Sequence, residues 1–202
     1  KIFLLIFKKK QILKVNHNKV SFDDLIIYRE FIFNKLSNII HQKHLKAIES
    51  FNGDGVVVHI RMGDFKSGEN ENQIREGAWN IRISLKWYKS IIEKIVNVNK
   101  DINVYIFSDA TNKELKEILD IYNVKRCYFG SAISDLLALS RGKVLVASAS
   151  TFSMWASFLG QNHTIWFPGQ KKFKIIQNKN IFEGELDYSD SLPKNIINYV
   201  SK

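Results

Sequence analysis

Cysteine is almost absent from this sequence, because Cys127 is the single one among 202 residues. One cysteine excludes an intramolecular disulfide framework and any zinc site built on several cysteines. Cys127 stands next to Tyr128 and Phe129 in a predicted buried strand. We therefore expect a packed, unreactive thiol at this position.

A membrane-length apolar run is also missing. The apolar run Ile2 to Phe7, before Lys8 to Lys10, is far shorter than the roughly 20 residues of a membrane span, and no signal-peptide cleavage pattern follows it. Because the chain opens inside this run with Lys1, we expect that an N-terminal portion is missing. We interpret the run as a strand of a truncated domain, with the remnant of a Golgi-type anchor as the alternative. The expected location is the cytoplasm or the periphery of a membrane.

Two common phosphate-binding motifs do not occur. No Gly-x-Gly-x-x-Gly follows a predicted strand, and there is no Gly-x-x-x-x-Gly-Lys-Ser/Thr, which argues against dinucleotide dehydrogenases and P-loop NTPases. The formal charge of +10 admits a nucleic acid, an anionic membrane face or an anionic small substrate as a partner. The lysines are scattered over the whole length, and Lys171 to Lys174 comes without a nucleic-acid motif. We therefore expect a solvated loop there and no nucleic-acid partner.

Strands and helices alternate along the chain. Apolar residues at three- and four-residue spacing predict helices, and short β-branched or apolar runs predict strands. Helices are predicted at Ser21 to Leu45, at Ser84 to Val98, after a Thr111 cap with Glu114, after Ser134, and at Thr151 to Leu159. Strands are predicted at Val56 to Ile60, Ile102 to Phe107, Arg126 to Phe129, Lys143 to Ala147 and Thr164 to Phe167, and a long loop at Lys66 to Gly77. This alternation without hairpin signals predicts an α/β fold with a Rossmann-like, mainly parallel sheet covered on both faces.

Polar side chains gather where the predicted strands end. His59, Arg61 and Asp64 follow the first strand, Ser108 with Asp109 the second, and Ser148 to Ser153 a later one. Ligands of parallel sheets bind beyond the carboxyl ends of the strands, so one crevice is expected to hold these groups. The Ser148 to Ser153 turn leads into a helix start, whose free N–H groups favour an anion. We predict that Arg61 binds phosphate beside this turn.

In three ordered motifs the chain resembles the fucosyltransferase superfamily, and most closely the α-1,2-fucosyltransferases of glycosyltransferase family 11. The family motif His-x-Arg-Arg-x-Asp is matched by His59 to Asp64, and Phe107 to Asp109 is similar to a strand end of the family. A later motif, an Asp followed by a helix, a strand and a Ser-Thr-Phe-Ser-Trp-Trp turn, is matched by Asp135 to Leu139 and by Ser150 to Trp155. The resemblance covers roughly Ser21 to Pro168.

The resemblance implies a GT-B enzyme that transfers fucose, with inversion and without a metal or cofactor, from GDP-fucose to a galactoside-type glycan hydroxyl. Residues 51–202 would form the Rossmann-like, donor-binding C-terminal domain, and residues 1–50 would be the remnant of an N-terminal domain with a connecting helix. By motif position, the donor contacts would be Arg61 to the β-phosphate, His59 and Asp135 to guanine, and Ser150, Thr151 and Ser153 to the pyrophosphate and fucose. Fixed cations and N–H donors suit a departing diphosphate.

An inverting transfer also needs a base for the acceptor hydroxyl. Asp64 and Glu69 are the candidates, the first fixed by the motif and the second on the adjacent predicted loop. Asp109 is expected to brace the sheet edge instead.

Three departures from the family motifs leave alternatives open. Met62 replaces the second arginine, and Ala149 and Met154 replace an Asn and a Trp of the later motif. The first alternative is therefore a catalytically silent nucleotide-sugar or glycan-binding module. The second alternative, a basic nucleic-acid binder, rests on the formal charge of +10.

Each site residue also has a purely structural interpretation. His59 could be a satisfied core histidine, and Arg61 could simply pair with Asp64. Asp135 could be an early-turn helix acid, and Thr151 and Ser153 could only cap a helix.

Overall fold

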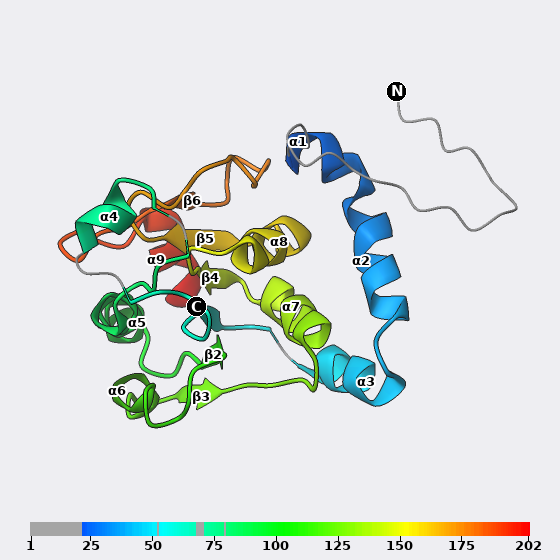
Figure 1. The fold of residues 1–202 in the computed structure, drawn as a ribbon, viewed down its shortest axis with the longest axis horizontal. Helices are drawn as coiled ribbons and strands as arrows, with labels where there is room; N and C mark the ends of the chain where they lie inside the picture. Colours follow the sequence, from blue (N-terminus) through cyan, green and yellow to red (C-terminus); the bar gives the residue numbers. More distant parts are fainter. Residues whose placement is uncertain (1–21, 52, 68–70, 79) are drawn as a thin grey trace, which may run out of the picture.

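A six-stranded parallel sheet organises the protein. The computed structural model describes residues 22–202 except residues 52, 68–70 and 79 (Figure 1). The strand order is β3-β2-β1-β4-β5-β6, and every pair of neighbours runs parallel. The strands are β1 (Val56–Ile60), β2 (Val104–Ser108), β3 (Val124–Arg126), β4 (Val144–Val146), β5 (His163–Trp166) and β6 (Glu183–Glu185). The predicted Rossmann-like α/β fold is therefore confirmed.

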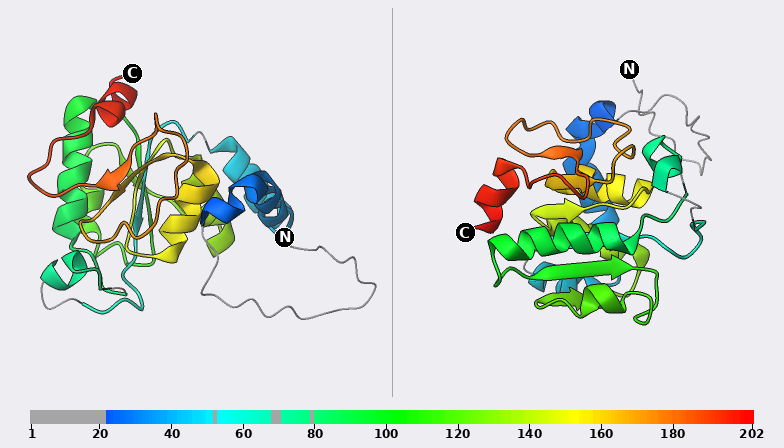
Figure 2. Two further views of the ribbon diagram at one scale, coloured as in Figure 1. Left: turned by 90° about the horizontal axis from the view of Figure 1, so that it is seen from above. Right: turned by 90° about the vertical axis from the view of Figure 1, so that its left-hand side faces the viewer.

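Helices cover both faces of the sheet, as two views at right angles show (Figures 1 and 2). One face carries α5 (Leu85–Val98), α6 (Lys116–Leu119) and α9 (Lys194–Val200). The opposite face carries α3 (Gln42–Ser50), α7 (Ala132–Arg141) and α8 (Thr151–Gly160). The sheet is thus buried from both sides, which is why its strands are nearly continuous apolar runs.

The alternation of side chains along β1 divides the core into two clusters. Val56, Val58 and Ile60 are fully buried in the cluster on the α5 side. Val57 points the other way, into the cluster that contains Leu137 of α7 and Phe158 of α8. Because β1 lies in the middle of the sheet and is buried on both faces, its C-terminal end is held rigidly in place.

The predicted helix at Ser21 to Leu45 is wrong in its continuity. Ser21 lies outside the described residues, and the rest forms α1 (Phe22–Leu25), the 3₁₀ helix η2 (Ile26–Tyr28), α2 (Arg29–Asn38) and α3. The chain leaves the helical conformation at His41, which is extended with φ −61° and ψ 136°. The Nδ1 atom of His41 accepts a hydrogen bond from the Lys43 N–H and so caps α3. The local cap therefore overrides the helical apolar spacing.

The segment predicted as a long loop at Lys66 to Gly77 contains a short helix, α4 (Glu71–Arg75). A remote segment fixes it, because the Arg75 guanidinium makes two hydrogen bonds to the Asp187 carboxylate. The Tyr188 hydroxyl also donates to Glu71. These partners lie more than 110 residues away, so periodicity within the segment could not reveal them.

Smaller corrections concern helix caps and strand limits. Thr111 and Glu114 form the predicted capping box, in which each accepts the backbone N–H of the other, although α6 begins only at Lys116. Ser131, and not Ser134, caps α7 through the Ser134 N–H.

Cys127 follows β3 instead of lying inside it. It is half-buried, and burial followed by the charge of Asp135 raises its thiol pKa to about 11. The thiol therefore stays protonated at neutral pH, as expected for an unreactive cysteine.

Candidate functional site

A cleft of about 600 Å³ lies beyond the carboxyl ends of the central strands. The chain runs outward from β1 through β2 to β3 and then crosses over to β4, which lies on the other side of β1. The crevice therefore forms at the point where the strand order reverses. The residues that line it are His59, Arg61, Asp64, Phe65, Asn80, Phe107, Ser108, Asp109, Tyr128, Ala132, Asp135, Ala149, Ser150, Thr151 and Phe152. Segments from β1, β2, β3 and β4 thus meet in one cavity, as predicted from the strand ends.

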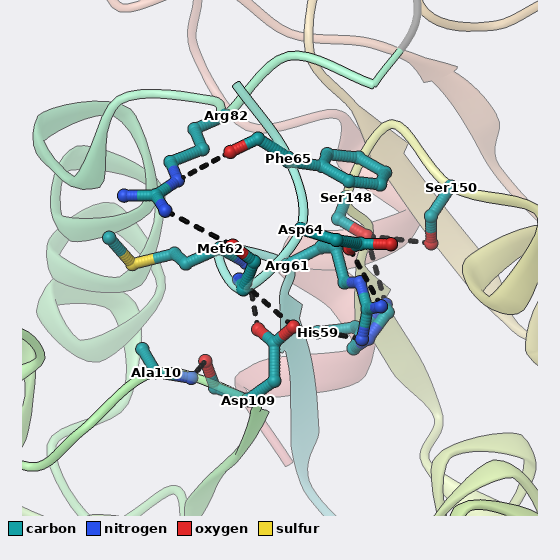
Figure 3. A network of polar contacts seen from close by, with 12 residues as sticks. His59, Arg61, Met62, Asp64, Phe65, Arg82, Asp109, Ala110, Ser148 and Ser150 are labelled. Atoms are coloured by element: carbon teal, nitrogen blue, oxygen red, sulfur yellow. Dashed lines mark hydrogen bonds and ion pairs between the residues drawn. The ribbon is translucent and has the colours of Figure 1, made fainter. Parts of the chain in front are cut away.

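Arg61 provides the positive charge of the cleft. Its guanidinium lies between two carboxylates, with Nη2 2.8 Å from Asp64 Oδ1 and Nη1 2.8 Å from Asp109 Oδ2 (Figure 3). It also lies 5.8 Å from the centre of the Phe65 ring, within the range of a cation–π contact. The predicted pairing with Asp64 is therefore present. However, the Arg61 side chain is still 36% exposed, so a ligand in the cleft can reach it.

Asp109 braces the turn that follows β1, as expected. Its two carboxylate oxygens accept the backbone N–H groups of Met62 and Gly63 at 2.7 and 3.0 Å. Partial burial pushes the pKa of Asp109 upward, but these two N–H groups and the Arg61 guanidinium outweigh burial and hold the pKa below its ordinary value. The carboxylate is therefore charged at neutral pH and fixes one edge of Arg61.

Arg82 supports the same turn from outside. Its guanidinium donates to the carbonyl oxygens of Phe65 at 2.8 Å and of Gly63 at 3.3 Å. The sequence interpretation missed this residue, because nothing in the local pattern around Arg82 points to a turn about 20 residues earlier. The side chain of Met62, in contrast, extends away from Arg61 in Figure 3 and packs on the apolar core. The position of the second family arginine thus does not line the cleft in this chain.

His59 rests on a buried network of hydroxyl groups. Its Nδ1 lies 2.8 Å from Ser153 Oγ and 2.9 Å from Ser148 Oγ, and its ring lies 4.9 Å from that of Phe152. The pKa of His59 is lowered to about 4, chiefly by desolvation on burial; the Asp109 charge opposes this shift and the Arg61 charge adds to it. The imidazole is therefore neutral at physiological pH, and it serves as a hydrogen-bonding wall of the cleft and carries no charge.

The turn after β4 contributes hydroxyls at two depths. Ser150 is the N-cap of α8 and accepts the Ser153 N–H at 3.3 Å, while Thr151 is exposed at the cleft surface. Both line the cavity. Ser153 is fully buried and accepts the Ser148 N–H at 3.1 Å. It therefore supports His59 from below, and this burial corrects the expectation that Ser153 lines the pyrophosphate.

Asp135 lies at the far end of the cleft, in the first turn of α7. Its Oδ1 accepts the Phe129 N–H at 2.7 Å. Burial raises the pKa of Asp135 to about 6, although the Phe129 hydrogen bond opposes the shift. Among the described residues, no basic side chain forms an ion pair with Asp135. It is a half-buried carboxylate in a wall of the cleft, without an ion-pair partner among the described residues, and such groups are typical of functional sites.

The remaining predicted site residues and substitutions fall in three places. Asp64 lies at the cleft mouth with a side chain that is 71% exposed, whereas Glu69 lies outside the described residues. Ala149 lines the cleft, and Met154 is buried in the core on the α8 side. The loss of the family Trp at Met154 is therefore a change of packing, and the loss of the family Asn at Ala149 removes a polar group from the wall.

Two further observations concern the described part of the chain as a whole. No helix in it combines the length and apolar character needed to cross a bilayer. Within the same residues, no group of three or more His, Cys, Asp or Glu side chains is arranged to hold a metal ion.

The basic segment Lys171 to Lys174 is exposed, and the Lys171 ammonium donates a hydrogen bond to the Glu183 carbonyl oxygen of β6.

Comparison with known proteins agrees with the motifs at the strand ends. No curated protein was found to match the chain. The family model described as glycosyl transferase family 11 matches residues 18–182, a stretch that contains β1 to β5 and every described residue predicted for the site. The matched region is most of the sequence and includes the complete cleft, so this chain belongs to glycosyl transferase family 11, a family of fucosyltransferases.

Proposed function

We propose that this chain binds GDP-fucose in the cleft and transfers fucose, with inversion and without a metal, to a galactoside-type glycan hydroxyl. The observation that carries the proposal is the meeting of Arg61 with the start of α8 at the switch point of the sheet. A partly exposed guanidinium and the free N–H groups of a ten-residue helix both favour a diphosphate at this point. The neutral His59 adds a hydrogen-bonding group to the same wall.

The choice of guanine rests on Asp135. Its Oδ1 is engaged by the Phe129 N–H, and no described residue donates to its Oδ2. An ionised carboxylate only accepts hydrogen bonds. Guanine offers two adjacent N–H donors on its Watson–Crick edge, whereas uracil offers one N–H between two carbonyl oxygens that would face the carboxylate. We therefore infer a preference for GDP over UDP.

The transfer step follows from the positions of Arg61 and Asp64. The acceptor oxygen attacks the anomeric carbon from the face opposite the diphosphate, a new C–O bond forms, and the bond from that carbon to the β-phosphate oxygen breaks. Arg61 and the N–H groups of α8 take up the charge on departing GDP. Asp64, exposed at the mouth of the cleft, accepts the acceptor proton.

The ion pair between Arg61 and Asp64 gives binding of the donor a further consequence. The phosphate competes with Asp64 for the guanidinium, and the displaced carboxylate is then free to face the acceptor. Asp109, held by two backbone N–H groups, stays on Arg61 and preserves its orientation.

Calorimetric titration of GDP into matched variants tests the proposal. Arg61→Ala removes charge-assisted hydrogen bonds worth roughly 1.5 to 3 kcal/mol each, so the Kd for GDP should rise about tenfold or more. Arg61→Lys keeps the charge but loses the fork of donors, and its Kd should lie between the two. Arg141→Ala is the control, because Arg141 ends α7 and contacts Phe51 and Glu49 carbonyl oxygens away from the cleft. Equal GDP binding by the Arg61→Ala variant and the unchanged chain would refute the phosphate role.

A second candidate function is a silent GDP-fucose-binding module. The observation that favours it is Met62, whose side chain packs on the core where the family motif has a second arginine. Incubation of the chain with GDP-fucose and a panel of galactosides separates the two functions. Release of GDP that depends on the galactoside supports transfer, whereas tight GDP binding without release supports the silent module.

A further inference from the structure

Tyr128 is a large aromatic residue that the fold leaves exposed inside the cleft. It lines the cavity, and 71% of the residue is accessible to solvent. The sequence interpretation put Tyr128 in a buried strand, which is wrong because β3 ends at Arg126. Its neighbour Phe129 does turn inward and packs against Phe51 and Phe107. The core therefore takes the ring of Phe129, whereas the ring of Tyr128 stays largely exposed.

The backbone on both sides of Tyr128 is nevertheless fixed. The Cys127 N–H donates to the Ile106 carbonyl oxygen at 2.8 Å. The Phe129 N–H donates to Asp135 Oδ1 at 2.7 Å. Tyr128 is thus attached to β2 on one side and to the first turn of α7 on the other, and its position relative to the Asp135 carboxylate is set by a single hydrogen bond. A ring held in this way loses little conformational freedom when a ligand binds.

The position of Tyr128 in the sheet matches one end of a nucleotide. Tyr128 follows β3, whereas Arg61 follows β1, and β2 lies between them. Neighbouring strands are about 4.8 Å apart, so the ends of β3 and β1 are separated by roughly 10 Å. This separation suits an extended nucleoside diphosphate whose diphosphate meets Arg61, because its base then reaches the β3 end of the cleft.

We propose that Tyr128 is the stacking platform for the nucleobase of the donor, with Asp135 beside it to take the N–H donors of the base edge. This proposal rests on the proposed binding of GDP-fucose in the cleft, and it adds Tyr128 as the residue that supplies affinity for the base. The phenol ring covers one face of guanine, and the carboxylate reads its edge. Stacking depends on the area of the ring, so it favours the larger purine over uracil in addition to the preference set by Asp135.

Calorimetry with GDP and with inorganic pyrophosphate tests this assignment, because pyrophosphate has no base to stack. Stacking of a base on an aromatic side chain is lost on alanine substitution, so Tyr128→Ala should raise the Kd for GDP by about five- to 150-fold. The Kd for pyrophosphate should change by less than about twofold. Tyr128→Phe keeps the ring and should retain GDP binding. The matched control is Tyr122→Ala, because Tyr122 is 70% exposed and does not line the cleft.

The outcomes separate this proposal from the one on which it rests. A loss of GDP affinity in Tyr128→Ala, together with unchanged pyrophosphate binding and a neutral Tyr122→Ala, supports the platform. GDP binding that is equal in Tyr128→Ala and the unchanged chain overturns the platform and leaves the phosphate site intact. An equal loss of GDP and pyrophosphate affinity also overturns it, since the ring would then support the phosphate end. Failure of the unchanged chain to bind GDP contradicts the proposed function itself.

Discussion

Replacement of Asp135 by asparagine should make the protein more stable and a weaker binder of GDP at the same time. The pKa of Asp135 is raised by burial from its ordinary value of 3.8 to about 6. The folded state therefore holds the proton more tightly than the unfolded chain. The free energy of unfolding therefore falls as the pH rises from about 4 to about 6, and the destabilisation by ionised Asp135 is complete above this range.

The size of the penalty follows from the same pKa. Each tenfold change in proton affinity corresponds to about 1.4 kcal/mol, so the shift sets an upper bound of about 3 kcal/mol. Asp135 is only half-buried, and solvent screening reduces the expected gain at pH 7 to about 1 to 2 kcal/mol. Asparagine retains an oxygen that can accept the Phe129 N–H, so the hydrogen bond between residues 129 and 135 is kept.

Urea denaturation of Asp135→Asn and of the unchanged chain at pH 7 and pH 4 measures this difference. The free energy of unfolding of the variant should be higher at pH 7, and the two proteins should converge at pH 4. GDP titrations at pH 7 should show weaker binding by the variant, because the charged acceptor for the base is lost. A variant that is less stable at pH 7, or a gap that is the same at both pH values, would refute the reasoning.

Three further substitutions test the support around the cleft. Ser153→Ala leaves the buried Ser148 N–H without its acceptor and removes one of the two hydroxyl partners of His59 Nδ1. Urea denaturation should therefore show a loss of about 1 to 3 kcal/mol, against no loss for Ala at the exposed Ser201. Gly63→Ala would place a Cβ 2.5 Å from Asp109 Oδ2 and so shift the turn that carries Arg61. A calorimetric titration should then give a Kd for GDP about tenfold higher. An unchanged Kd would count against the support of this turn by Asp109. Asp64→Asn removes the competitor for Arg61, so its Kd for GDP should fall by about two- to fivefold, whereas the transfer rate should fall by about 100-fold or more. A higher Kd for GDP, or a transfer rate equal to that of the unchanged chain, would contradict the two roles of Asp64.

The sheet was predictable because its strands are short, β-branched and separated by amphipathic segments. Val56–Ile60 is apolar except for His59 and is buried along its whole length, and such a run has few other stable positions than the centre of a parallel sheet. The helices were less predictable at their ends. His41 interrupts the first helical segment, and α4 forms where a loop was expected because Asp187 and Tyr188 hold it. Contacts of this kind depend on tertiary structure, which periodicity does not record.

Much of the cleft was also predictable, since parallel strands bring their carboxyl ends together. His59 and Arg61 come from the end of β1, Asp135 and Thr151 come from the first turns of α7 and α8, and all four line one cavity. The burial of Ser153 was not foreseen, because the depth of a hydroxyl within a turn is set by how the helix packs on the sheet.

The supporting residues were not foreseen either. Arg82 reaches the turn after β1 through carbonyl oxygens, and a contact to backbone leaves no trace in residue types. Tyr128 was expected to be buried because its neighbours are apolar, but the strand ends before it.

The proposed function requires that Arg61 meets the diphosphate of a nucleotide sugar at the switch point of the sheet. A crystal structure of the chain soaked with GDP tests it most directly. We expect the β-phosphate within about 2.8 Å of the Arg61 guanidinium, with Asp64 displaced from Arg61 and Asp109 still in contact with it. GDP bound elsewhere, with Arg61 still bridging Asp64 and Asp109, would show that Arg61 does not bind the diphosphate.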